Sequence, residues 1–320
     1  MQTQQEFLKL REHLAEAIVG QSELLDRLLI SMLTGGHVLL ESLPGLAKTT
    51  AVTTLASGVN ASFRRIQFTP DLLPGDLTGT EIFDPQQGSF NFVQGPLFNE
   101  IVLADEINRA PPKVQSALLE AMQEKQITVG GITRALPELF IVMATQNPLE
   151  QSGTYPLPEA QLDRFLLHVV LDYPSANEEL EILKRDHAMV YGKKKEALHS
   201  PLHAEQVLQA RNEVGDIHVS EELERYIVEL VGATRRLEAF EESWGAYLQA
   251  GASPRASLAL LRASRALAYI QGREYVVPDD IIAMVPDVLR HRLVLAYAAR
   301  ASGVTADKII QRVLKEVIIP

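Results

Sequence analysis

The residues best suited to chemistry lie in one short stretch, residues 39–50, where an apolar run leads into a tight turn and then into Lys48, Thr49 and Thr50. This is the layout of a phosphate-binding loop, in which backbone N–H groups and a helix N-terminus hold a triphosphate. Lys48 could reach the β- and γ-phosphates, and the Thr49 hydroxyl could bind Mg²⁺. The stretch therefore predicts an ATP site, and the alternative is an ordinary strand–turn–helix with a surface lysine.

Two positions in this loop depart from the usual pattern G-x-x-x-x-G-K-[ST]. Ser42 and Ala47 stand where glycines are usual. Alanine adds only one methyl group, whereas a serine would be strained if the position required φ > 0. The sequence alone thus leaves open whether Ser42 weakens the site.

A second group of polar residues follows the apolar run at 101–104. Asp105 at the tip of this predicted strand could hold the Mg²⁺ shell, and Glu106 could act as a general base on an attacking water. The alternative is an exposed acidic turn after a core strand. Two such matches in the right order, after two separate strands, favour a nucleotide site.

Three further residues are candidates by position. Asn147 follows the predicted strand at 139–145, at the strand end where α/β sheets bind ligands, and could orient the attacking water or contact the γ-phosphate. Its alternative is a loop residue that starts a turn before proline. Arg164 and Arg255 are isolated arginines of a kind usually found on surfaces, so they gain a role only from the resemblance described below.

The elements that must position these residues alternate between β-rich and helical patterns in the first half of the chain. Four of the five predicted strands are nearly continuous apolar runs, as in a parallel sheet buried on both faces, and the strand at 63–68 is more polar and is expected nearer an edge. Glycines between β-rich runs predict two hairpin inserts, at 80–96 and 127–136. The strands are expected at residues 37–41, 63–68, 101–105, 139–145 and 166–171.

After Pro174 the strand patterns give way to helical ones, and Ser220 and Pro278 are good helix starts. The sequence therefore predicts an α/β core over residues 1–174 and an all-α domain over residues 175–320. Helices are expected at residues 177–190, 203–214, 221–237, 255–271, 279–297 and 305–317.

Composition narrows the function classes. The chain has 320 residues, no cysteine and a net charge of −11, so it lacks thiol chemistry and its charge argues against general nucleic-acid binding. No apolar run approaches the roughly 18 residues of a membrane span, and the first residues lack a signal-peptide profile, so a cytoplasmic location is expected.

Taken together, five segments resemble the MoxR group of AAA+ ATPases, over nearly the whole chain. Alanine at position 47 is common in that group, and Ser42 is the real departure from it. The segments are Leu-Pro-Gly-Leu-Ala-Lys-Thr49, Ala-Asp-Glu-Ile-Asn-Arg-Ala-Pro-Pro112, Ala-Thr-Gln-Asn-Pro148, Gly-Thr-Tyr-Pro-Leu-Pro-Glu-Ala-Gln-Leu-Asp-Arg-Phe165 and Gly-Ala-Ser-Pro-Arg255.

The resemblance implies a fold and a set of roles. The fold is an AAA+ P-loop core with a parallel five-stranded sheet and two hairpin inserts, followed by an all-α lid. Asp105 and Glu106 would be the Walker B pair and Asn147 the first sensor. Arg164 would reach the ATP of a neighbouring subunit as an arginine finger, and Arg255 would link the lid to the γ-phosphate as the second sensor. Val19 and Gly20 would line the adenine pocket, and the loop residues Pro44, Gly45, Leu46, Ala47, Lys48, Thr49 and Thr50 would hold the phosphates.

The resemblance also implies an activity and partners: Mg²⁺-dependent ATP hydrolysis in a homo-oligomeric, most often hexameric, ring that remodels protein clients. Proteins with von Willebrand factor A domains and metal-cofactor insertion or complex assembly belong to this expectation. Three alternatives stay open: a non-hydrolysing nucleotide-switch scaffold, a DNA-remodelling AAA+ motor, and a P-loop kinase or GTPase. Intact Glu106, Asn147 and Arg164 oppose the first, the net charge opposes the second, and the helical lid opposes the third.

Overall fold

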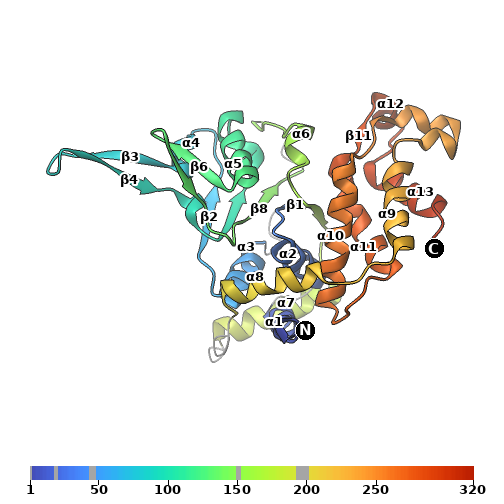
Figure 1. Ribbon diagram of the computed structural model, residues 1–320, viewed down its shortest axis with the longest axis horizontal. Coiled ribbons are helices and arrows are strands. Elements are labelled where there is room, and N and C mark those ends of the chain that lie inside the picture. Colours follow the sequence, from blue (N-terminus) through green and yellow to red (C-terminus); the bar gives the residue numbers. More distant parts are fainter. Residues whose placement is uncertain (1, 18–20, 43–47, 149–152, 192–201) are drawn as a thin grey trace.

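The computed structural model describes residues 2–17, 21–42, 48–148, 153–191 and 202–320 (Figure 1). A parallel five-stranded sheet with the strand order β2-β5-β8-β1-β9 forms the centre of the N-terminal part. All five predicted strands are present, and the polar β2 lies at the edge as expected. They are β1 (Val38–Ser42), β2 (Phe63–Gln67), β5 (Ile101–Asp105), β8 (Ile141–Gln146) and β9 (Leu167–Leu171).

The two faces of the sheet bury separate hydrophobic cores, because successive side chains along a strand point to opposite faces. On β1, Val38 and Leu40 belong to the first core, on one face of the sheet. Leu39 belongs to the second core, on the other face. This double burial explains why the central strands are nearly continuous apolar runs. The first core is covered by α1 (Gln2–Ala17), α2 (Ser22–Thr34) and α3 (Lys48–Gly58), and the second by α5 (Pro112–Glu124).

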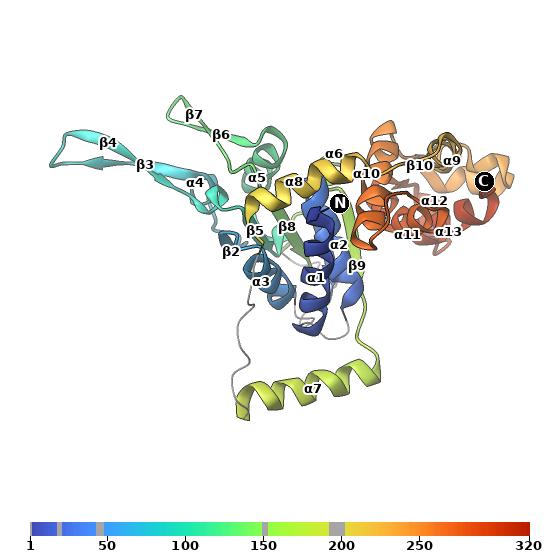
Figure 2. The same ribbon diagram turned by 60° about the horizontal axis from the view of Figure 1, so that its bottom comes forward.

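Both predicted hairpins are present, and they project from the body of the core (Figure 2). The first pairs β3 (Gly79–Asp84) with β4 (Ser89–Gln94) after the short helix α4 (Pro74–Thr78), and the second pairs β6 (Gln126–Val129) with β7 (Ile132–Ala135). The hairpins contact each other, and the Arg134 guanidinium lies 3.9 Å from the centre of the Phe92 ring.

The C-terminal part is helical, as predicted, with one addition. The chain leaves the predicted helix at 279–297 early, because Arg292 turns inward and donates hydrogen bonds to the backbone oxygens of Phe165 and Leu166. The next residues form β11 (Val294–Leu295), which pairs with β10 (Leu248–Ala250) in a small ribbon that the sequence analysis missed. The helices of the C-terminal part are α7 (Ala176–Tyr191), α8 (Ala204–Gly215), α9 (Glu221–Ala233), α10 (Pro254–Ile270), α11 (Pro278–Leu289), α12 (Tyr297–Ala301) and α13 (Ala306–Glu316), with 3₁₀ turns at Leu237–Ala239, Glu242–Tyr247 and Arg290–Arg292. The N-terminal part also contains the short helix α6 (Glu159–Leu162) and 3₁₀ turns at Pro96–Phe98 and Ile107–Arg109.

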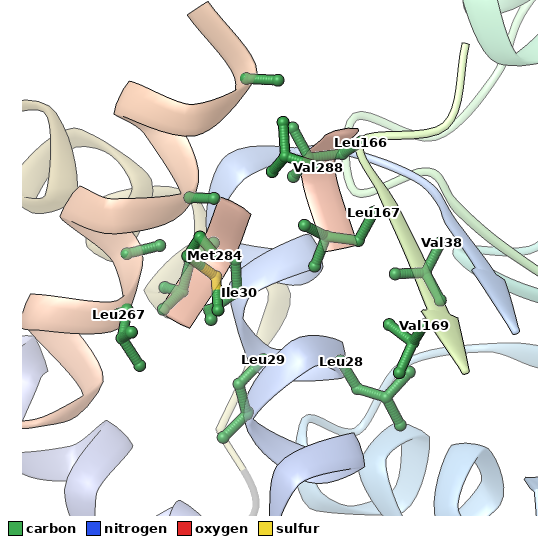
Figure 3. Close-up of a cluster of buried hydrophobic side chains, with 14 of the residues drawn as sticks. Leu28, Leu29, Ile30, Val38, Leu166, Leu167, Val169, Leu267, Met284 and Val288 are labelled. Atoms are coloured by element: carbon green, nitrogen blue, oxygen red, sulfur yellow. The ribbon is translucent and has the colours of Figure 1, made fainter. Parts of the chain in front are cut away.

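The helical part packs directly on the sheet through α2 and β9 (Figure 3). Beside this apolar contact, Arg27 of α2 and Asp287 of α11 form a buried ion pair at 2.6 Å. Helix α8, which follows residue 174, packs against α1 and α2 of the N-terminal part. The division into two domains after residue 174 remains a prediction. The apolar contact includes Leu28, Leu29, Ile30, Val38, Leu166, Leu167, Val169, Leu267, Met284 and Val288.

Candidate functional site

Asp105 and Glu106 lie at the carboxyl end of β5, where Thr145 of the neighbouring strand β8 joins them. The Thr145 hydroxyl donates to Asp105 Oδ1 at 2.5 Å and accepts the Glu106 backbone N–H at 2.9 Å. Glu106 has left-handed backbone angles (φ 59°, ψ 50°), which cost a non-glycine residue about 1–3 kcal/mol. Successive residues of a regular strand point to opposite faces, so this turn is what lets both carboxylates share one edge of the sheet.

Side chains of the edge strand β2 hold both carboxylates. Arg65 donates from Nη2 and Nε to Asp105 Oδ2, at 2.6 and 3.1 Å, and Gln67 donates from Nε2 to Glu106 Oε2 at 2.7 Å. Arg109 adds an ion pair to Glu106 at 3.2 Å. These residues were not among those predicted for the site. The available signal was the alternation of Arg65 and Gln67, which places both on one face of β2.

Lys48 and Thr49 begin α3, the helix that follows the loop after β1. Burial lowers the pKa of the Lys48 ammonium, while the charges of Asp105 and Glu106 act in the opposite direction by favouring its charged form. The lysine therefore lies within electrostatic range of the acid pair. Thr49 is partly buried in the first turn of α3, and Thr50 beside it is exposed.

Ser42 is an ordinary strand residue. It ends β1, pairs with Leu171 of β9 and is 2% exposed. Extended backbone is open to any residue, so the missing glycine causes no strain here. The remaining residues predicted for the loop and the adenine pocket lie outside the described residues: Val19, Gly20, Pro44, Gly45, Leu46 and Ala47.

Asn147 lies just beyond β8, the strand between β5 and β1. It therefore stands between the acid pair and the loop after β1, and it is partly exposed. The residue before it, Gln146, donates to Glu41 Oε2 of β1 at 3.0 Å, and His168 Nε2 of β9 lies 2.9 Å from the same oxygen. These contacts link the carboxyl ends of β8 and β1 to the amino half of β9.

Arg164 and Arg255 lie where the parallel strands begin, at the opposite end from the acid pair. We call the side of the sheet where the strands begin its amino edge, and the side where they end its carboxyl edge. Arg164 precedes β9 and donates to the Leu119 carbonyl at 2.7 Å, and Arg255, at the start of α10, pairs with Asp163 at 3.1 Å. Since β1 and β9 are parallel, the segment before β9 and the loop after β1 are separated by the strand length, about 15 Å. The fold brings Arg255 close to Arg164, and its role as the second sensor at a γ-phosphate remains a prediction.

These two arginines line a cavity of about 280 Å³ together with Arg262 and Arg292. Arg292 pairs with Asp163 at 2.9 Å, on the carboxylate oxygen that Arg255 leaves free. Among the described residues that line the cavity, four arginines accompany one acid. This charge balance suits an anion supplied from outside the chain.

The side chains at the carboxyl edge fit a magnesium nucleotide. Mg²⁺ prefers oxygen ligands and commonly binds through one or two carboxylates plus substrate phosphates. Thr49 and Asp105 offer a hydroxyl and a carboxylate, and Lys48 stands at a helix N-terminus, which suits phosphate. In the described part of the chain no three His, Asp or Glu side chains form a group that could hold a metal ion by themselves.

Comparison with known proteins agrees with this geometry. Residues 37–167 match the family model for the ATPase family associated with various cellular activities (AAA), and residues 245–313 match the AAA lid domain. The chain is 48% identical over 307 residues to Chaperone MoxR1 of Mycobacterium tuberculosis, covering 95% of this chain and 79% of that protein. It is 33% identical to Protein MoxR of Paracoccus denitrificans, over 88% of this chain and 86% of that one.

The chain belongs to the MoxR family of AAA+ ATPases. A crystal structure of a candidate ATPase from Cytophaga hutchinsonii matches this MoxR chain with a TM-score of 0.90 at 45% identity, covering all of this chain and 97% of that one. The parallel five-stranded sheet and the helical lid are consistent with an AAA+ ATPase fold. Within the described residues, none of the helices has the length and apolar character needed to cross a bilayer.

Proposed function

We propose that this MoxR protein hydrolyses ATP to ADP and phosphate with Mg²⁺, at interfaces between copies arranged in a hexameric ring. The observation that carries the proposal is the position of the two groups of functional residues. The phosphate-binding lysine and the acid pair lie at one edge of the sheet, and the arginines lie at the other. Copies arranged head to tail would bring the arginine edge of one chain to the acid edge of the next.

At such an interface each residue would have a distinct role. Glu106 would accept a proton from the attacking water while Asn147 orients that water. Lys48 would bind the β- and γ-phosphates, and Arg164 and Arg255 of the neighbouring copy would stabilise charge on the γ-phosphate. Thr49 and Asp105 would hold Mg²⁺, which would neutralise phosphate charge.

The biological output that we propose is chaperone-like remodelling of protein clients in the cytoplasm, including complex assembly or metal-cofactor insertion with von Willebrand factor A domain partners. The relative named Chaperone MoxR1 supports the chaperone part of this proposal. The two projecting hairpins are the elements we assign to contact with clients or with the ring pore.

Ser42 gives no support to the non-hydrolysing scaffold, because it is an unstrained strand residue. The DNA-remodelling motor remains disfavoured by the net charge of −11. A steep salt dependence of DNA-stimulated turnover would favour the motor over the protein remodeller.

The experiment that tests hydrolysis compares Glu106→Gln with a matched surface control, Glu229→Gln on the exposed side of α9. Glu106→Gln should bind ATP with near-native affinity and lower the turnover number by about 10²–10⁴-fold, because the amide removes the general base. The control should hydrolyse like the wild type. Wild-type turnover in Glu106→Gln would remove Glu106 from the reaction, and a wild-type chain that assembles but never hydrolyses ATP would favour the scaffold.

A further inference from the structure

Arg65 forms two hydrogen bonds to the carboxylate of Asp105, which we expect to face Mg²⁺. Its Nη2 and Nε both donate to Asp105 Oδ2, at 2.6 and 3.1 Å, although half of the arginine side chain, 48%, is exposed. The other carboxylate oxygen, Oδ1, accepts the Thr145 hydroxyl. Both oxygens of Asp105 are therefore already engaged by groups of the chain itself.

The same arginine is connected to the proposed general base. Arg65 Nη2 also donates to Gln67 Oε1 at 2.9 Å, and Gln67 Nε2 donates to Glu106 Oε2 at 2.7 Å. A single chain of hydrogen bonds thus runs from Asp105 through Arg65 and Gln67 to Glu106. Because Arg65 and Gln67 are two residues apart on an edge strand, they share one face of that strand.

A guanidinium and a divalent cation compete for one carboxylate, because each is stabilised by the same negative charge and they repel each other. Asp105 is 13% exposed, so this competition is only partly screened by water. The exposed arginine, in contrast, has solvent available to it when it leaves. The arrangement favours exchange of Arg65 for an incoming cation over permanent pairing.

We propose that Arg65 is a latch on Asp105: it neutralises this carboxylate in the nucleotide-free chain and leaves when Mg²⁺ enters with nucleotide. The proposal rests on the proposed function of this site. Its consequence is that Asp105 becomes available to the cation only once Arg65 has left, so Arg65 is a positioning residue that acts through Asp105.

Binding measurements test the latch without relying on hydrolysis. A fluorescent, non-hydrolysable ATP analogue is titrated at a series of Mg²⁺ concentrations and again in EDTA, with the wild type, Arg65→Met and the adjacent control Arg64→Met, whose side chain is exposed on the opposite face of β2. Arg65→Met should lower the half-saturating Mg²⁺ concentration by roughly threefold, the size expected for losing a half-exposed ion pair, and leave binding in EDTA unchanged. Arg64→Met should match the wild type.

A second pair of variants protects this test against a folding defect. Arg65→Lys keeps a charge but loses the two-bond geometry, so it should fold and give an intermediate Mg²⁺ response. In an Asp105→Asn background, Arg65→Met should cause no further change, because the carboxylate for which it competes is gone. An unchanged or raised Mg²⁺ requirement in folded Arg65→Met would overturn the latch, as would weaker binding in EDTA, which would mark Arg65 as a phosphate ligand. Failure of the wild type to bind the analogue with Mg²⁺ would instead refute the proposed function.

Discussion

The two edges of the central sheet differ in how far their charges are satisfied within one chain. At the carboxyl edge, Asp105 and Glu106 are bonded to Thr145, Arg65 and Gln67. At the amino edge, the described residues that line one cavity include four arginines and one aspartate. The first edge can rest in a closed, neutralised state, whereas the second offers excess positive charge. We infer that the second edge is completed by phosphate bound to another copy.

The largest effect on turnover is expected from removing one arginine of the amino edge. Arg164→Ala should lower the turnover number by about 10³-fold, because it removes charge stabilisation of the transferred phosphoryl group, and should leave nucleotide affinity unchanged. Steady-state ATPase assays and equilibrium nucleotide binding on the same preparation separate the two effects. Lost affinity with intact turnover would place Arg164 in ground-state binding instead. The exposed Arg225→Ala on α9 serves as the control.

The amino edge also carries a buried histidine whose protonation should weaken the fold. Val142 N–H donates to His37 Nδ1 at 2.9 Å, so Nε2 carries the proton toward the Met122 carbonyl. Burial lowers the pKa of His37 from 6.5 to about 4. The folded state therefore disfavours the charged form, and stability present above pH 6.5 falls as the pH drops toward 4.

This effect amounts to about 3 kcal/mol at most, from 1.36 kcal/mol per pKa unit. Urea unfolding at several pH values checks it, with His37→Gln as the comparison: the variant should be less stable at pH 7 but lose less stability between pH 6.5 and 4. Parallel pH curves for the two proteins would show that His37 is not a source of the acid sensitivity.

The smallest effect is expected at the carboxyl edge, from restoring the missing glycine. Ser42→Gly should not raise ATP affinity, because Ser42 already has extended backbone within β1. It should lower the free energy of unfolding by about 0.5–1 kcal/mol through the greater freedom of glycine in the unfolded chain. Nucleotide titration and urea unfolding check both parts, and a clear gain in affinity would show that Ser42 impairs the loop.

Much of this organisation could be predicted because it is local. Apolar runs predicted five strands, and polar residues at the strand ends predicted the acid pair and Asn147. What could not be predicted depends on contacts between distant segments. Arg65 is an ordinary polar residue of an edge strand until the parallel pairing of β2 with β5 brings it to Asp105. The position of Arg255 beside Arg164 likewise depends on how α10 packs against the segment before β9.

The central claim is that two edges from different copies form each site, and mixing two inactive variants tests it most directly. Glu106→Gln keeps an intact arginine edge, and Arg164→Ala keeps an intact acid edge. In an equimolar mixture, half of the acid edges are intact and half of the neighbouring arginine edges are intact, so about one quarter of the interfaces are complete. We expect the mixture to recover about a quarter of the wild-type ATPase rate, and a mixture as inactive as its components, despite verified co-assembly, would contradict the account.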